Sequence, residues 1–116
     1  MIKENLIKEK SFDFAIKIVD LTRALDIVKK EHILSKQLLR SGTSIGANIN
    51  EAQFSPTKAD FINKMNISLK EANETLYWIE LMHKTNYITN EEYNNIINDI
   101  IDIKNILMAI VKNAKN

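Results

Sequence analysis

The chain has 116 residues, of which 45% are hydrophobic and 27% charged, a composition typical of one globular domain. It holds no cysteine, which excludes disulfides, a thiol nucleophile and thiolate metal ligands. The formal net charge of +1 lacks the basic excess usual in nucleic-acid-binding proteins, and no apolar run reaches the roughly 18 residues of a membrane span. We therefore expect a single cytoplasmic domain over residues 1–116, with no membrane partner.

The first predicted helix covers residues 11–30, where apolar side chains recur at spacings of three and four. These apolar positions are Phe14, Ile18, Leu21, Leu25 and Val28. Residues 1–10 alternate charged and apolar side chains and form either an arm or an extension of this helix.

The second predicted helix covers residues 33–54 and ends before Pro56, because proline disfavours helical backbone at the residue preceding it. Its predicted core seam is Leu34, Leu38, Ser41, Ile45, Asn48 and Ala52. The only two glycines of the chain, Gly42 and Gly46, lie in this helix, where each costs about 1 kcal/mol relative to alanine. Together with Ser41, they predict a helix that its neighbours approach closely.

The third and fourth predicted helices cover residues 57–84 and 90–114. The fourth has a clear start signal, because Thr89 and Glu92 form the T-x-x-E pattern of a capping box. Four amphipathic helices joined by short turns predict an all-α protein, an antiparallel up-down-up-down four-helix bundle.

One stretch of the second helix carries no charge between Arg40 and Glu51, whereas a solvated helix face is normally rich in Lys and Glu. These two residues are about 16 Å apart along the helix, too far to pair with each other. Each therefore pairs with an adjacent helix or with a neighbouring subunit. The second alternative predicts a subunit interface on the flank that holds Arg40, Ser44, Ala47 and Glu51.

Asn48 lies near the predicted seam of the second helix. A polar side chain at such a position is typical of a buried amide that bonds to a neighbouring backbone or side chain and fixes the register. We interpret Asn48 as structural, like Ser41 and the two glycines.

The segments "LSKQLLRSGTSIGANINEA" and "KADFINKMNISLKEANETLYWIELM" fall within residues 34–82. In these segments the chain resembles the bacterial four helix bundle family, also called the 23S rRNA-intervening-sequence protein family. The accessory protein of diversity-generating retroelements is a relative. The resemblance implies a four-helix up-down protomer and a ring-like homopentamer, with motif residues of the second and third helices near the subunit boundaries.

Carried over position by position, the motif residues of the second helix are Arg40, Ser41, Ser44, Ile45, Asn48, Ile49 and Glu51. Those of the third helix are Phe61, Ser68, Glu71 and Thr75. Trp78 lies about two turns past Glu71 on the same stripe. The resemblance therefore adds Glu71, and with it Trp78, to the predicted interface.

The retroelement relatives bind nucleic acid through a strongly basic surface, whereas this chain is nearly neutral. In an antiparallel bundle, however, both termini and the second turn lie at one end. Seven lysines gather there against Glu4, Glu9, Asp13 and Asp60: Lys3, Lys8, Lys10, Lys58, Lys64, Lys112 and Lys115. Repeated around a ring, this basic rim would give sequence-tolerant binding of RNA or DNA.

The alternative function is a protein-interaction scaffold with no role in nucleic-acid binding. It is favoured by three apolar side chains that lie off the stripe of the third helix: Ile67, Trp78 and Leu81. If exposed, they would mark a contact surface for a partner. Cover by the second helix or by another subunit is the simpler interpretation.

An enzyme is the third possibility, and the pattern does not support it. Glu80 and His83 form one E-x-x-H, whereas a di-iron bundle needs two such motifs and two further glutamates. No Ser-His-Asp set, glycine-rich phosphate loop or pair of acids in a cleft is evident. We predict no catalytic residues, no cofactor, no metal and no small-molecule substrate.

Overall fold

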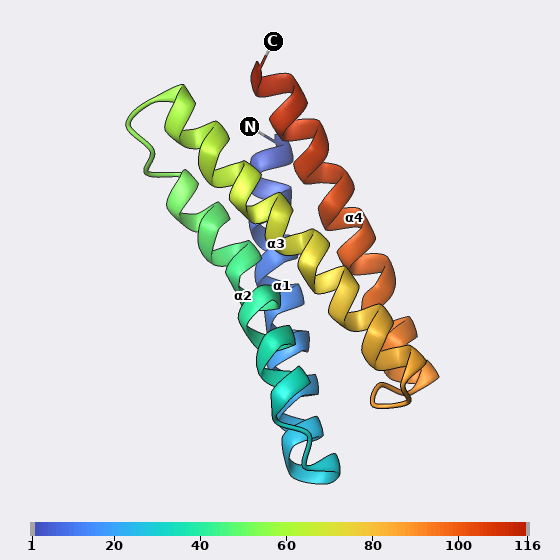
Figure 1. The fold of residues 1–116 in the computed structure, drawn as a ribbon. Coiled ribbons are helices and arrows are strands. Elements are labelled where there is room, and N and C mark those ends of the chain that lie inside the picture. Colours follow the sequence, from blue (N-terminus) through green and yellow to red (C-terminus); the bar gives the residue numbers. More distant parts are fainter. Residues whose placement is uncertain (1, 116) are drawn as a thin grey trace.

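We describe the protein from a computed structural model, which places residues 2–115. Its elements are α1 (Ile2–Ala24), the π-helical segment η1 (Leu25–Lys29), α2 (Ile33–Ala52), α3 (Lys58–Lys84) and α4 (Asn90–Lys115). Consecutive helices run in opposite directions, and α4 also packs against α1, which closes the bundle (Figure 1). The predicted all-α, up-down-up-down bundle is confirmed, and it measures 45 × 21 × 19 Å.

The ends of the bundle differ in what they hold. Both chain ends and the turn between α2 and α3 lie at one end, as predicted, and the two other turns lie at the opposite end (Figure 1). None of the helices within residues 2–115 combines the length and the apolar character of a membrane span.

The first helix begins nine residues before its predicted start at residue 11. Of the two alternatives for residues 1–10, the helical extension is observed over residues 2–10, and residue 1 lies outside the described residues. The physical reason is burial, because Ile7 has no exposed surface and joins the core. The sequence did not reveal this extension of the apolar stripe to Ile7, because charged and apolar residues alternate over residues 1–10.

The end of the first helix also differs from the prediction, because the last turn is a π-helix over Leu25–Lys29. Lys30 follows with a left-handed backbone (φ 53°), and its N–H bonds to the carbonyl of Leu25, five residues back. In a π-helix each residue advances less around the axis than in an α-helix. Leu25 therefore stays buried, whereas Val28, predicted in the core, is 75% exposed.

Side-chain caps begin the last two helices, and the capping box of α4 is the predicted one. The side chain of Thr57 accepts a hydrogen bond from the N–H of Asp60 at 3.1 Å, so α3 begins at residue 58 rather than 57. Thr89 and Glu92 form the reciprocal bonds of the predicted capping box, at 2.9 and 3.1 Å. The second helix ends at Ala52, two residues before its predicted end, and the fourth ends at residue 115 rather than 114.

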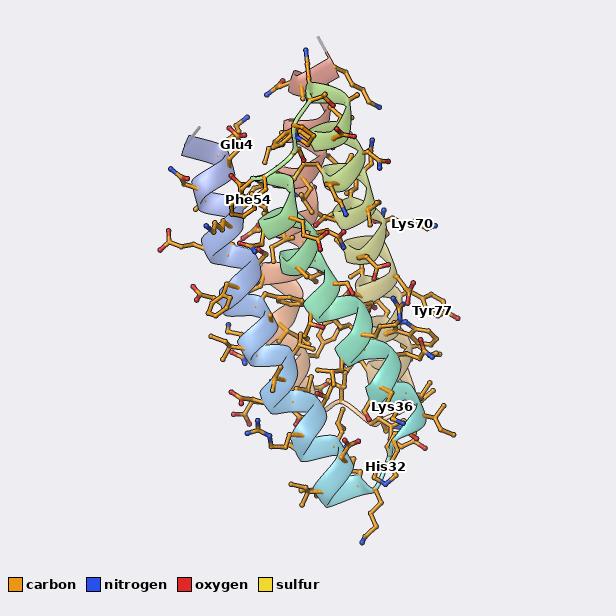
Figure 2. All side chains as sticks on the ribbon, turned by 90° about the vertical axis from the view of Figure 1, so that its left-hand side faces the viewer. Glu4, His32, Lys36, Phe54, Lys70 and Tyr77 are labelled. Atoms are coloured by element: carbon orange, nitrogen blue, oxygen red, sulfur yellow. The ribbon has the colours of Figure 1, made fainter. Side chains whose placement is uncertain are left out.

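The core seam of α2 is rotated relative to the predicted one. Leu34 and Asn48 are only half-buried, whereas Ser35, Gly42 and Ile49 are buried. The difference arises because α1 and α3 both pack against α2, so that two flanks are covered instead of one. Seen from the left-hand side of Figure 1, α2 lies between α1 and α3 (Figure 2).

Candidate subunit interface and basic rim

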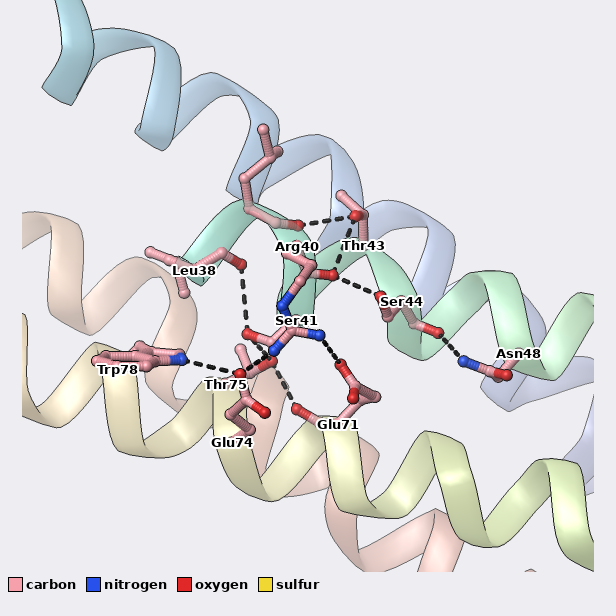
Figure 3. A network of polar contacts seen from close by, with 11 residues as sticks. Leu38, Arg40, Ser41, Thr43, Ser44, Asn48, Glu71, Glu74, Thr75 and Trp78 are labelled. Atoms are coloured by element: carbon pink, nitrogen blue, oxygen red, sulfur yellow. Dashed lines mark hydrogen bonds and ion pairs between the residues drawn. The ribbon is translucent and has the colours of Figure 1, made fainter. Parts of the chain in front are cut away.

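Arg40 on α2 lies opposite two glutamates on α3 (Figure 3). Its Nη1 is 3.1 Å from Oε2 of Glu71, and its Nη2 pairs with Oε2 of Glu74. The indole N–H of Trp78 donates to the same Glu74 carboxylate at 3.1 Å. This hydrogen bond, and after it the guanidinium, lowers the pKa of Glu74, and Glu74 in turn raises the pKa of Arg40.

Beneath this ion-pair group, hydroxyl groups link the same two helices in the core. The Thr75 hydroxyl lies 2.9 Å from Oγ of Ser41 and 2.7 Å from the carbonyl of Glu71. Ser68 donates to the carbonyl of Ile45 at 2.8 Å. The three hydroxyl side chains belong to residues with no exposed surface. Because an unmade bond would cost more here than at the surface, these contacts fix how α2 and α3 sit against each other.

The charges of the predicted interface have partners on the adjacent helix of the same chain. Glu51 accepts from the Lys64 ammonium at 2.7 Å, as Arg40 pairs across to α3. Ser44 donates to the carbonyl of Arg40 at 2.6 Å, within α2. The adjacent-helix alternative is therefore the one observed for Arg40 and Glu51. An interface with another copy remains a prediction for Arg40, Ser44, Ala47, Glu51, Glu71 and Trp78.

The two glycines lie on the side of α2 that faces α1. A Cβ at Gly42 would lie 2.9 Å from Cγ2 of Ile18 and 3.1 Å from its Cγ1. A Cβ at Gly46 would lie 3.3 Å from Oγ of Ser11 and 3.5 Å from its carbonyl oxygen. The predicted close approach is confirmed, and it is tighter at Gly42, where the neighbour is a stiff, buried, β-branched side chain.

Asn48 takes a different role from the predicted one. Its amide donates to the carbonyl of Ser44 at 2.9 Å, one turn back in the same helix, and the residue is half-buried. A bond within one helix fixes no register between helices. That role falls to the buried hydroxyl groups of Ser41, Ser68 and Thr75, which the sequence reasoning had not assigned to it.

Above the glycines, a groove of about 590 Å³ runs between α1 and α2 on the outer surface. Phe12, 67% exposed, lines it, and Gly46 and Ala47 contribute from α2. Ile16 continues the apolar surface along α1, and Phe54, 80% exposed, lies at the end of α2 (Figure 2). We call this surface the α1–α2 face.

The outward row of α2 on this face is uncharged, and it consists of Leu39, Thr43, Ala47, Asn50 and Phe54. The missing charges between residues 40 and 51 were the signal in the sequence that could reveal it. Phe12 and Ile16 were missed, because the stripe assigned to the first helix covered only its buried side. Ala47 belongs both to this row and to the predicted interface flank.

The basic rim lies at the end of the bundle that holds both termini, and five of its seven lysines are exposed: Lys3, Lys8, Lys58, Lys112 and Lys115. Lys64 pairs with Glu51, and Lys10 lies 3.9 Å from Asp102. These two carboxylates were not counted in the prediction. With them the seven lysines face six carboxylates instead of four, so the rim is less positive than expected.

The single E-x-x-H motif is occupied by contacts within the chain. Glu80 accepts a hydrogen bond from the hydroxyl of Tyr93, which raises the pKa of that tyrosine. The ring of His83 stacks on Tyr93 with centroids 3.9 Å apart, and its Nε2 lies 2.8 Å from Oδ1 of Asn90. Among the described residues, no three His, Asp or Glu side chains are grouped so as to hold a metal ion.

These features define the class of protein as an antiparallel four-helix bundle. The chain belongs to the 23S rRNA-intervening sequence protein family, whose profile matches residues 3–109. It is also similar to a crystal structure from Bacteroides thetaiotaomicron, described as a protein of unknown function from the S23 ribosomal protein family. The two chains are 55% identical, the match covers 95% of this chain and 98% of the other, and the TM-score is 0.92.

No curated protein matches the chain. Neither the description of the family nor that of the structural relative names an enzyme. They agree with the resemblance found in the sequence, which covered residues 34–82, and extend it over most of the chain.

Proposed function

We propose that the protein is a non-enzymatic, homo-oligomeric scaffold of the cytoplasm, a ring of about five copies in line with the resemblance of its sequence. The α1–α2 face is the observation that carries the proposal. Phe12 and Phe54 are more than half exposed there, beside a groove with a small-residue floor. Contiguous apolar surface of this kind marks a protein contact site, and a second copy of the chain covers it in the assembly.

Charge supports a copy of the chain as the occupant. Between Leu39 and Phe54 the outward row of α2 on this face is uncharged, and the charged residues that line the groove all come from α1: Lys8, Glu9 and Asp13. Because these three carry both signs, a second copy of the chain can pair with them instead of leaving a buried charge unpaired. The Arg40 and Glu51 flank borders the same row through Ala47. Arg40 and Glu51 both have partners on α3. The flank therefore adds polar contacts to the interface without burying either charge unpaired.

The test is the solution mass of the purified chain by light scattering, against the protomer mass of 13.4 kDa. We expect a mass near five protomers for the natural chain and a lower mass for Ala47→Glu, which places a charge in the groove. Asn73→Glu is the matched control, because Asn73 is an exposed position on α3, and it leaves the mass unchanged. A natural chain that is monomeric overturns the proposal.

Two further variants locate the contact. Phe12→Ser removes an aromatic ring from the α1–α2 face, whereas Ser44→Glu alters the flank beside Arg40. Loss of mass with Phe12→Ser places the contact on the α1–α2 face. Loss of mass with Ser44→Glu alone places it on the predicted flank instead.

Binding of RNA or DNA at the basic rim is the second proposed activity, and the five exposed lysines of the rim support it. In an assembly each copy adds a set of these lysines, and repeated phosphate contacts make binding strong at low salt and weak at high salt. The measurement is the anisotropy of a labelled single-stranded RNA at two salt concentrations. Lys58→Gln with Lys112→Gln reduces both the affinity and the salt slope, whereas the control Lys70→Gln, midway along α3, does not.

Absence of RNA and DNA binding by an assembled protein favours the alternative, a protein-interaction scaffold with no nucleic-acid role. The three apolar side chains that favoured this alternative are half-buried, so they leave little surface on α3 for a partner: Ile67, Trp78 and Leu81. The same light-scattering peak provides a first indication, since bound nucleic acid raises its absorbance at 260 nm relative to 280 nm.

A further inference from the structure

The turn between α1 and α2 presents three aliphatic side chains to solvent. Ile27 is 69% exposed, Val28 75% and Ile33 77%. This turn lies at the end of the bundle opposite the basic rim, where Figure 2 labels His32 and Lys36. We call residues 23–36 the tip.

The tip also carries an excess of positive charge. It holds four cations, Arg23, Lys29, Lys30 and Lys36, against two carboxylates, Asp26 and Glu31. Its formal charge of +2 therefore exceeds the +1 of the whole chain. Both carboxylates are engaged by the protein, since Asp26 accepts from the hydroxyl of Ser35 at 2.6 Å and Glu31 accepts from the N–H of Leu34.

Contacts to neighbouring elements hold the tip in place. Lys29 donates to the carbonyls of Asn86 at 3.1 Å and Tyr87 at 2.6 Å, which ties η1 to the α3–α4 turn. The Asp26–Ser35 hydrogen bond ties η1 to α2. The π-helical geometry then directs Val28 outward, so the exposure of the aliphatic side chains is built into the fold.

A partner of the tip must contact both the exposed aliphatic side chains and the cations around them. This requirement limits which kind of molecule can bind there. A second copy of the tip would bring like charges together. A nucleic acid would satisfy the cations but place its phosphates against three apolar side chains. An anionic lipid surface satisfies both groups at once, because it offers phosphates to the cations and an apolar boundary just beneath them.

We propose that the tip binds the surface of an anionic lipid bilayer, with Ile27, Val28 and Ile33 inserted at the boundary between headgroups and acyl chains. Arg23, Lys30 and Lys36 then face the headgroup phosphates. Such a contact is peripheral and needs no membrane-spanning helix, so it revises only the expectation that the protein has no membrane partner. It is independent of the proposed assembly, although several tips on one ring would strengthen it by avidity.

The test is co-sedimentation of the full chain with vesicles of phosphatidylglycerol and phosphatidylcholine, compared with vesicles of phosphatidylcholine alone. We expect binding to the first and not to the second. Lys36→Gln weakens binding about fivefold, as expected for one lysine at an anionic surface. Lys30→Asn has a similar effect and keeps a residue that tolerates the left-handed backbone.

The apolar part of the proposal has its own variant. Val28→Ser with Ile33→Ser reduces binding at least about tenfold, because two inserted side chains are lost. The matched control is Met108→Ser, which changes a 49% exposed apolar side chain on α4. Circular dichroism and the light-scattering mass show that each variant keeps its helices and its assembly.

Three results overturn the proposal. One is a natural chain that does not sediment with the anionic vesicles, as expected if the tip binds an acidic protein instead. Another is binding that falls with Lys36→Gln but is unchanged by the serine pair, which would be surface attraction without insertion. The third is a loss of mass in the serine pair, which would make the tip a contact between copies.

Discussion

The two sides of α2 are held by different means. Toward α3, the helix is linked by buried hydroxyl groups and by the ion pairs of Arg40 and Glu51. Toward α1, it is held by close packing at Gly42 and Gly46, where the backbones of the two helices approach. Hydrogen bonds and ion pairs are directional, so they favour one axial position of α2 relative to α3. Close packing at small residues favours one distance between α2 and α1.

The difference predicts how the two contacts fail. A lost hydrogen bond removes a directional preference and leaves the packing in place. An added side chain at a glycine forces the helices apart and disturbs every contact along them. Substitutions on the α1 side should therefore span a wider range of effects than those on the α3 side.

Gly42→Val should have the largest effect. Its Cβ alone would lie 2.9 Å from Cγ2 of Ile18, and the two methyl groups add further overlap in a region with no free space. We expect a loss of about 3 kcal/mol in the free energy of unfolding, measured by urea denaturation at one fixed protein concentration.

The control for this variant is Thr43→Val, which has a similar shape and lies next in sequence on the outer row of α2. It should change the free energy of unfolding by no more than about 0.5 kcal/mol. Equal stability of Gly42→Val and the natural chain would show that Gly42 does not set the distance between α1 and α2.

Thr75→Val should have the second-largest effect. The substitution keeps the shape of the side chain but removes the hydroxyl that lies 2.9 Å from Ser41. We expect a loss of about 1 to 2 kcal/mol, because the Ser41 hydroxyl stays buried with one partner fewer. Ser41→Ala in the same background removes that orphaned hydroxyl, so the double variant should lose less than the sum of the two single variants. Strict additivity would contradict a link between α2 and α3 at this point.

The fold was predictable from the sequence because the apolar spacing, the single proline and the T-x-x-E pattern each reflect local chemistry. The two glycines, together with Ser41, likewise predicted that neighbouring helices approach α2 closely. The π-helix was not predictable, because Leu25 and Val28 have the spacing of an ordinary α-helical stripe. Its consequence, the exposure of Val28 at the tip, therefore could not be found from the sequence.

The candidate sites were predictable in part. The absence of charge between Arg40 and Glu51 corresponds to the uncharged outward row of α2, but the pairing of both residues with α3 depends on how two helices pack. Some lysines of the rim form ion pairs with residues distant in sequence, as Lys10 does with Asp102. The sequence therefore does not show which of these lysines are unpaired. Long-range pairing of this kind needs coordinates.

Trp78→Phe tests the contacts between α2 and α3 through the dependence of stability on pH. The indole hydrogen bond is the largest cause of the lowered pKa of Glu74, ahead of Arg40. A carboxyl group with a lowered pKa adds stability above its unfolded pKa, and this stability is lost as the pH falls through the folded pKa. The variant should therefore raise the pKa of Glu74 and reduce the dependence of stability on pH in the acidic range.

The measurement is a titration of the Glu74 carboxyl carbon by NMR. Arg40→Gln is the matched comparison, and it should also raise the pKa of Glu74, because it removes both the charge of the guanidinium and its hydrogen bond. An unchanged pKa of Glu74 in Trp78→Phe would show that the indole hydrogen bond does not lower it. The smaller ring of Trp78→Phe also loses packing, but this loss is the same at every pH. The slope of stability against pH therefore reports the pKa of Glu74 separately from the loss of packing.

Gly46→Ala should have the smallest effect, and its sign should be opposite to that of Gly42→Val. Its Cβ would lie 3.3 Å from Oγ of Ser11, so the neighbour must move by only a few tenths of an ångström. Alanine in turn gains up to about 1 kcal/mol of helix propensity over glycine, so we expect a change between zero and a gain of that size in urea denaturation. A loss of stability as large as that of Gly42→Val would mean that α1 and α2 are equally tight along their whole contact, and that the two glycines together set the distance between the helices.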